Sequence, residues 1–203
     1  MPGVAGSSPA SSTITTNREE HVIIRPWTLK QRTLSFADPP WVEVYSDTVE
    51  LPDGRTRDRF HHIVLPEYAI TCAITPERRF VMVREYKHGA ARICLNAPAG
   101  RVEDGEEPLA GAQRELLEET GFAADEWRAL GAFVVDASTG CSRAHVFLAR
   151  NARPVAAPHP DELEEIDVVL LEENGLRAAL AAGEIVMMPT ACALALALLA
   201  LRN

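Results

Sequence analysis

The stretch GRVEDGEEPLAGAQRELLEETGF, residues 100–122, carries the strongest pattern in the chain. Its apolar residues recur at helical spacing, at Leu109, Ala112, Leu116 and Leu117. They predict a helix from about Pro108 to Thr120, since proline is tolerated in the first turn of a helix. Gly121 then stands where a left-handed capping residue is needed. The stretch is therefore predicted to form a loop, a helix and a glycine cap.

Four glutamates of this stretch are spaced to act together. On a helix, Glu115 and Glu119 lie one turn apart on the same face, with Glu118 beside them. These like charges repel, and Glu106 from the preceding loop adds to the repulsion. Magnesium prefers hard oxygen ligands and would remove the repulsion, while Arg114 is placed to pair with Glu118 and hold its orientation. The alternative interpretation is a solvated acidic face on a surface helix.

Strand patterns dominate the rest of the chain. Two β-rich runs around the turn sequence LPDG predict a hairpin or meander over residues 41–65. We expect further strands at YAITCAI, RFVMVREY, WRALGAFVVD, AHVFLAR and IDVVLLE, and helices at LRAALAAGEI and in the Ala/Leu-rich C-terminal segment. This order predicts an α/β (α+β) fold with a mixed β-sheet and few helices.

The composition of the chain limits the kinds of molecule that it is expected to bind. The net charge of -9 argues against a nucleic-acid polymer, because proteins that bind one usually carry clustered Lys and Arg. An acidic enzyme still binds phosphates when metal ions lie between its carboxylates and the anion. The four scattered cysteines show no spacing typical of a zinc site or a disulfide framework, which favours a reducing, cytoplasmic setting.

The two ends of the chain differ in character. Residues 1–20 are small, polar and proline-containing, and we expect a mobile tail. They do not show the charged start and apolar run of a secretory signal. The C-terminal run ACALALALLALRN is too short to span a bilayer, so we expect a packed helix and no membrane partner. The predicted organisation is a tail (1–20), accessory strands (21–65) and a main domain (66–203).

The same stretch carries a family resemblance. Gly100, Glu106 and the run over 114–122 match every defining position of the Nudix box, so the chain resembles the Nudix hydrolases. The resemblance implies a mixed β-sheet sandwiched between helices, with the box as a loop-helix-loop unit. It also implies a bound magnesium ion, or manganese in its place, and water attack on one phosphorus of a diphosphate.

The resemblance further implies roles for the box residues. The implied metal ligands are Glu115, Glu119 and the Ala99 carbonyl. Glu118 would be a ligand or part of the network that activates the water. Structural support would come from Gly100, Arg114 and Gly121.

Residues before the box resemble the ADP-ribose pyrophosphatase branch of that family. This branch carries a Q-Y-R strand and an E-L-P-A-G segment, and here the chain reads VREYKHGA and NAPAG. The resemblance implies that Arg84, Tyr86 and Lys87 contact phosphate or nucleoside; the alternative is an edge strand with a cation that extends along the surface. Asn96 departs from the branch, because it replaces the glutamate of E-L-P-A-G.

The branch also places glutamates in a loop well beyond the box. In this chain the segment HPDELEEIDVV offers Glu162 as a general base and Glu164 as a further metal ligand. An acidic surface loop without a catalytic role is the alternative interpretation.

These resemblances imply a substrate and an oligomeric state. The sequences that mark dinucleoside polyphosphate, coenzyme A and NADH hydrolases are not evident, so ADP-ribose, cleaved to AMP and ribose 5-phosphate, is the leading substrate. Another nucleoside diphosphate sugar, or a nucleotide-sensing module without turnover, is the alternative. The branch implies a homodimer in which the N-terminal strands exchange contacts. Trp27, Trp41 and Phe60 are candidates for interface packing or base stacking.

Overall fold

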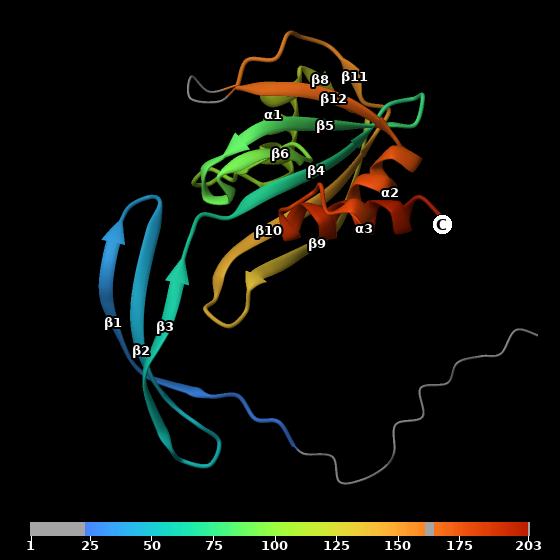
Figure 1. Ribbon diagram of the computed structural model, residues 1–203. Helices are drawn as coiled ribbons and strands as arrows, with labels where there is room; N and C mark the ends of the chain where they lie inside the picture. Colours follow the sequence, from blue (N-terminus) through green and yellow to red (C-terminus); the bar gives the residue numbers. More distant parts are fainter. Residues whose placement is uncertain (1–22, 161–164, 203) are drawn as a thin grey trace, which may run out of the picture.

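The computed structural model describes residues 23–160 and 165–202 of the 203-residue chain. A three-stranded sheet comes first and projects from a seven-stranded sheet that carries the helices (Figure 1). The expected mobile tail over 1–20 lies outside the described residues, and so do Glu162 and Glu164.

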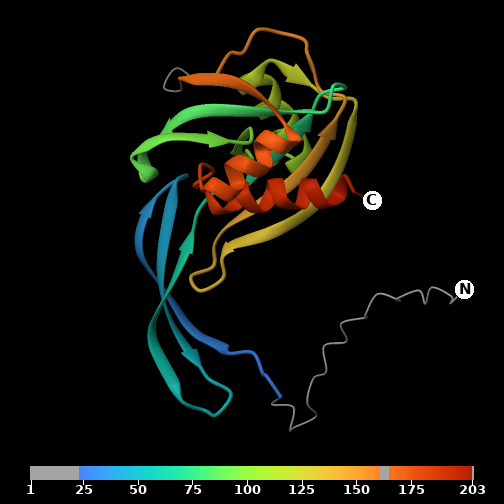
Figure 2. The same ribbon diagram turned by 45° about the vertical axis from the view of Figure 1, so that its right-hand side comes forward.

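The first sheet is an antiparallel accessory sheet in the order β1-β2-β3. Its strands are β1 (Thr28–Asp38), β2 (Val42–Glu50) and β3 (Thr56–Val64). The hairpin predicted around LPDG is confirmed as the β2–β3 connection, and β1 adds a third strand to it. The accessory sheet meets the rest of the chain where the Ile63 N–H donates to the Thr139 carbonyl at 2.9 Å. Most of its length extends away from the main body (Figure 2).

The main sheet is mixed, as predicted. Its central order is β12-β5-β4-β10-β9, in which β4 and β10 are parallel and the other neighbours are antiparallel. Two short strands extend it, since β6 pairs with β5 and β7 pairs with β4. The strands are β4 (Tyr68–Ile74), β5 (Arg79–Lys87), β6 (Arg92–Asn96), β7 (Ala99–Arg101), β9 (Glu126–Asp136), β10 (Cys141–Arg150) and β12 (Ile166–Glu172). A separate pair is formed by β8 (Phe122–Ala123) and β11 (Arg153–Pro154), and a 3₁₀ turn, His88–Ala90, follows β5.

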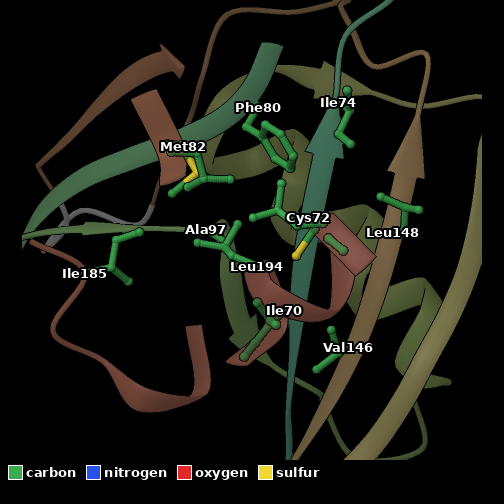
Figure 3. Close-up of a cluster of buried hydrophobic side chains, with 14 of the residues drawn as sticks. Ile70, Cys72, Ile74, Phe80, Met82, Ala97, Val146, Leu148, Ile185 and Leu194 are labelled. Atoms are coloured by element: carbon green, nitrogen blue, oxygen red, sulfur yellow. The ribbon is translucent and has the colours of Figure 1, made fainter. Parts of the chain in front are cut away.

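Helices cover both faces of the main sheet, which confirms the predicted sandwich. They are α1 (Pro108–Thr120), α2 (Glu173–Ala182) and α3 (Met188–Ala200). Along β4, Ile70, Cys72 and Ile74 point into a core shared with α2 and α3 (Figure 3). The alternate residues Ala69 and Ala73 join clusters that include side chains of α1. The two-residue period of β4 therefore decides which helices lie on which face.

Small residues on the α1 face let that helix approach the sheet closely. Ala69 and Ala73 are fully buried there, and the Thr71 hydroxyl donates to the Ala112 carbonyl at 3.2 Å. Helix α1 has the predicted bounds. The predicted LRAALAAGEI helix was placed too late, because α2 ends before Gly183, which caps it at φ 71°.

A divergence of two strands creates the space for the site. Strands β4 and β5 pair only through Ala73–Val81 and Ile74–Phe80, and then separate. In the opening, β7 pairs along β4 and β6 along β5. The short link between β6 and β7 therefore lies in this fork, beside α1.

Two expectations about the setting of the chain can be compared with the described residues. All four cysteines lie within them, and none of the four is in a disulfide. Within the same residues, each helix is too short or too polar to cross a membrane.

Candidate active site

Arg114 organises the acidic cluster on α1. Its Nε and Nη2 atoms donate to the two carboxylate oxygens of Glu106, each at 3.0 Å. Its Nη1 atom donates to Glu115 at 2.7 Å and to Glu118 at 3.0 Å, so the predicted pairing with Glu118 is present. Nη2 also donates to the Arg101 carbonyl at 2.9 Å. One guanidinium therefore ties Glu106 of the loop before α1 to Glu115 and Glu118 of the helix.

These contacts change the acidity of the partners. Hydrogen bonds from Arg114, and then one from the Glu103 backbone N–H, hold the pKa of Glu106 below its usual range. The carboxylates in turn raise the pKa of Arg114, with the bonds to Glu106 as the largest cause. The loop carboxylate thus stays ionised and keeps the guanidinium in place.

Glu119 lies deeper than its sequence position suggested. Helical spacing places Glu119 beside Glu115 but does not show what covers it, and in the structure Glu119 is only 2% exposed. Its Oε2 atom accepts a hydrogen bond from the Ala99 N–H at 3.0 Å. Burial raises the pKa of Glu119 well above its usual value, and the charges of Glu85 and Glu115 raise it further. Glu119 is buried because α1 approaches the sheet closely and this approach covers the side chain.

Gly100 makes room for Glu115. A Cβ atom built at Gly100 would lie 2.0 Å from the Cδ atom of Glu115 and 2.1 Å from its Oε1 atom. Gly100 is held in place on β7 by its pairing with Ala69 of β4. A side chain at this position would therefore displace the Glu115 carboxylate.

Gly121 has a different structural role, at the end of α1. It adopts a left-handed conformation with φ 72°, and its N–H donates to the Leu117 carbonyl at 2.7 Å. A Cβ atom here would lie 2.2 Å from the Ala156 carbonyl oxygen. Both the conformation and the close approach require glycine, as the sequence predicted for a helix cap.

A pocket of about 230 Å³ lies in the fork between β4 and β5. Ala99 and Gly100 line it on the side of the acidic cluster, Ile70 lines it from the sheet, and Met187 and Thr190 line it from the start of α3. Its polar lining residues include Glu67, Glu85, Lys87, Asn96 and Arg101. The Arg101 guanidinium lies over the Trp41 ring, 5.3 Å from its centroid, and both residues also line the pocket.

The three candidate substrate contacts of β5 lie in different surroundings. Lys87 lines the pocket, with its Nζ atom 2.6 Å from the Glu85 carboxylate. Arg84 is exposed and forms an ion pair with Asp167 of β12 at 3.1 Å. Tyr86 is 58% exposed, and its ring lies 6.3 Å from that of His88. Only Lys87 of the three is brought to the pocket.

Glu85 was not identified as a site residue from the sequence, and no structural partner was assigned to Asn96. Both are buried, and the Asn96 Nδ2 atom donates to Glu85 Oε1 at 3.0 Å. One signal was available, because Glu85 continues the two-residue period of the buried residues Val81 and Val83. A carboxylate at an inward-facing position of a strand needs a partner, and here it has two.

The donor chemistry of the cluster suits a divalent cation. Among residues 23–160 and 165–202, no three acidic, histidine or cysteine side chains already form a set that could hold a metal ion. Arg114 instead gathers the carboxylates of Glu106, Glu115 and Glu118. Glu115 and Glu119 nevertheless offer hard oxygen atoms from one helix face, and burial of Glu119 beside like charges favours a cation next to it.

Comparison with known proteins agrees with this geometry. A family model described as "NUDIX domain" matches residues 65–191. The ADP-ribose pyrophosphatase of Bacillus subtilis (strain 168) is 33% identical over 135 residues, which cover 65% of this chain and 72% of that protein. The ADP-sugar pyrophosphatase of Mus musculus is 29% identical over 177 residues, covering 84% and 78%. The methanol dehydrogenase activator of Bacillus methanolicus is 33% identical over 131 residues, covering 64% and 70%.

A solved structure extends the likeness to the fold. It is described as "Crystal structure of ADP compounds hydrolase" and matches with a TM-score of 0.72, covering 86% of this chain and 96% of that chain at 22% identity. With its box residues gathered around Arg114 and its family model matched over most of the main sheet, the chain belongs to the Nudix family and is a Nudix hydrolase.

Proposed function

We propose that this chain hydrolyses the diphosphate bridge of a nucleoside diphosphate joined to a sugar, with ADP-ribose as the leading substrate and AMP and ribose 5-phosphate as products. The names of the relatives in Bacillus subtilis and Mus musculus support this substrate class. Another nucleoside diphosphate sugar is the nearest alternative, because those names include both ADP-ribose and ADP-sugars.

The observation that carries the proposal is the contact between the acidic cluster and the pocket. Ala99 and Gly100 belong to both, since they line the pocket and contact Glu119 and Glu115. The pocket also presents two cations, Lys87 and Arg101. A ligand with a diphosphate can therefore lie with its charged bridge against the cluster and one of its end groups in the pocket.

We propose a divalent metal ion, magnesium or manganese, as the cofactor. The residues that would hold it are Glu115, Glu119, the carbonyl of Ala99 and, from outside the described residues, Glu164. Such an ion polarises phosphoryl oxygens and makes bound water a better nucleophile. The chain's own contribution is to fix Glu115, Glu119 and Ala99 by packing α1 against β7 and β4.

Two residues are proposed to act on the attacking water. Glu118 is 34% exposed in its side chain and is oriented by Arg114, so it is accessible from solvent and held in direction. Glu162 is the second candidate, as a general base, and lies outside the described residues. One described neighbour supports it: the His159 N–H donates to the Glu118 carbonyl at 2.8 Å, so the chain passes α1 shortly before Glu162.

Of the β5 candidates, we propose Lys87 as the phosphate contact. Neither Arg84 nor Tyr86 lines the pocket, so each would contact only a part of the substrate that extends out of the pocket, or would contact substrate bound to a second subunit.

We also propose that the chain forms a homodimer through the accessory sheet and that it acts in the cytoplasm. Every residue of β1 is exposed, including Leu29, Leu34 and Phe36, which is an unusual load of apolar surface for one strand.

An end-point assay tests the proposed reaction. The chain is incubated with magnesium and ADP-ribose, GDP-mannose, NADH or a diadenosine polyphosphate, and alkaline phosphatase then releases phosphate from any monoester product. Release from ADP-ribose, and less from the other three, supports the proposal. Tight binding of ADP-ribose without any monoester would instead favour a nucleotide-sensing module. That second function is retained because one relative is named an activator.

A further inference from the structure

A buried carboxylate and amide form one wall of the pocket, and the box does not include them. Glu85 of β5 and Asn96 of β6 are 6% and 2% exposed. The Asn96 Nδ2 atom donates to Glu85 Oε1 at 3.0 Å, and the other carboxylate oxygen, Oε2, lies 2.6 Å from Lys87 Nζ. The carboxylate of Glu85 therefore joins an amide on the neighbouring strand to a cation two residues further along its own strand.

We propose that Glu85 is a positioning residue for substrate binding: with Asn96 it forms a carboxylate–amide pair whose single negative charge holds the Lys87 ammonium at the pocket wall, against the diphosphate of the substrate. The proposal rests on the proposed function, because it names the residue that orients the phosphate contact. It concerns the substrate side of the pocket, where Lys87 lies.

The need for a positioning residue follows from the chemistry of lysine. An ammonium group is strongly hydrated and ends a flexible four-carbon chain, so a lysine at a pocket rim tends to extend into water. Here the Lys87 side chain is only 33% exposed, and that of Glu85 is 7% exposed. The ion pair keeps the ammonium beside the pocket before a ligand arrives, which reduces the rotamer entropy lost on binding.

The pair also explains two departures from the sequence pattern of the branch. Aligning E-Y-K of this chain with Q-Y-R puts Glu85 at the glutamine, and aligning N-A-P-A-G with E-L-P-A-G puts Asn96 at the glutamate. Each change alone would alter the charge of the pocket wall, but together they preserve one carboxylate and one amide. The hydrogen bond across β5 and β6 links the two positions directly. This contact predicts that the carboxylate and the amide can be exchanged between the two positions.

A double-mutant cycle separates positioning from a structural role. Glu85→Gln keeps an acceptor for Asn96 and removes the ion pair with Lys87. We expect KM for ADP-ribose to rise about five- to tenfold, with kcat within about twofold, because Lys87 must be ordered anew on binding. In a Lys87→Met background the same substitution should change KM by less than about twofold, since Glu85 then has no cation to hold.

An exchange variant makes the test sharper. Asn96→Glu alone places two carboxylates side by side in a buried site and should raise KM more than Glu85→Gln does. Adding Glu85→Gln to it restores one carboxylate and one amide, and we expect KM to return to within about threefold of the native value. Glu173→Gln serves as the matched control, because it removes a carboxylate that pairs with Arg177 far from the pocket.

Binding measured without turnover distinguishes this inference from the proposed function. Titration calorimetry with ADP-ribose in the presence of a chelator reports the Lys87 contact even if the chain hydrolyses nothing. If native protein binds but shows no turnover, and the cycle appears in Kd, the positioning role stands and the reaction does not. The inference would be overturned by an unchanged or lower KM and Kd in Glu85→Gln, or by an equal loss in the Lys87→Met background. It would also be overturned by a lack of rescue in the exchange variant, or by no binding of ADP-ribose to native protein.

Discussion

The carboxylate of Glu115 lies over Gly100, so close that a Cβ atom on the glycine would come within 2.0 Å of the Glu115 Cδ atom. This contact joins β7 to α1 at the point where the pocket meets the acidic cluster. The contact also explains, without reference to any family pattern, why a glycine is needed at position 100. The glycine is needed for the space above it and not for its conformation, because the backbone of Gly100 is not left-handed.

Gly100→Ala should therefore damage the site more than the fold. The new methyl group meets the end of a flexible side chain, so the Glu115 carboxylate moves aside at little cost in stability. We expect the hydrolysis rate to fall at least about tenfold and the melting temperature to change little. Gly175→Ala is the control, because a Cβ there contacts nothing within 4 Å and α2 should gain helix stability. Normal rates in Gly100→Ala would show that Glu115 does not need its position.

Glu119→Gln should raise the stability of the metal-free protein while it lowers the hydrolysis rate. The carboxylate is buried beside Glu85 and Glu115, so in the absence of metal a neutral side chain of the same shape should stabilise the fold by about 1 kcal/mol. The same change removes a proposed metal ligand, and we expect turnover to fall at least about a hundredfold. The measurements are thermal unfolding with a chelator and steady-state rates with magnesium.

Magnesium itself provides the second readout for Glu119. It should raise the melting temperature of the native protein but raise that of Glu119→Gln much less, because binding to the folded state is what stabilises. Glu107→Gln, an exposed change just before α1, should behave as the native protein does. Full activity of Glu119→Gln at saturating magnesium would remove Glu119 from the proposed metal site.

Arg114→Lys tests whether the cluster depends on a planar cation. A lysine keeps the charge, but it cannot donate to both oxygens of Glu106 while also contacting Glu115 and Glu118. We expect a loss of about 2 kcal/mol in the free energy of unfolding, measured by urea titration with a chelator. Arg177→Lys is the matched control, since its pair with Glu173 lies on the surface of α2 and should contribute less than about 0.5 kcal/mol. An equal effect of both substitutions would contradict the organising role of Arg114.

Much of the fold followed from periodicity alone. The strands YAITCAI and IDVVLLE and helix α1 have the predicted bounds, because each contains enough residues for its period to show. Strand β7 has three residues and β6 has five, which is too short for a reliable pattern. Their positions follow from the divergence of β4 and β5, a tertiary feature that local sequence does not contain.

The site was only partly predictable for a related reason. Helical spacing correctly placed Glu115, Glu118 and Glu119 on α1, but spacing does not reveal what covers a helix face, so the burial of Glu119 was missed. Glu85 stands among the charged residues of VREYK, where composition hides its inward direction. Its partner Asn96 is eleven residues away and meets it only through the pairing of β5 and β6.

The proposed homodimer makes a prediction for β1. Phe36→Asp places a charge on a strand whose apolar side chains Leu29, Leu34 and Phe36 are exposed. If these side chains bury against a second copy, the variant should elute as a monomer of 22.2 kDa, while native protein has about twice that mass by light scattering. Val155→Asp, on an exposed apolar residue of the main body, is the control. A native mass equal to that of one chain would contradict the proposed dimer.

The accessory sheet should lose stability in acid through one ion pair. Asp47 is buried on β2, and Arg32 of β1 donates to its two carboxylate oxygens at 2.8 and 2.7 Å. These hydrogen bonds lower the pKa of Asp47 below its ordinary value of 3.8. A carboxyl group whose pKa is lower in the folded state stabilises the fold above its unfolded pKa, and this contribution disappears as the pH falls through the folded pKa.

Asp47→Asn should therefore cost about 1–2 kcal/mol in the free energy of unfolding at pH 7, and progressively less below about pH 4. Urea unfolding followed by tryptophan fluorescence measures both values, since Trp27 and Trp41 flank β1. Glu50→Gln is the matched control, because its pair with Lys30 on the same two strands is solvent-exposed and should contribute less than about 0.5 kcal/mol. A difference between native protein and Asp47→Asn that stays constant from pH 7 to pH 3 would mean that the Asp47 carboxylate is not held by Arg32.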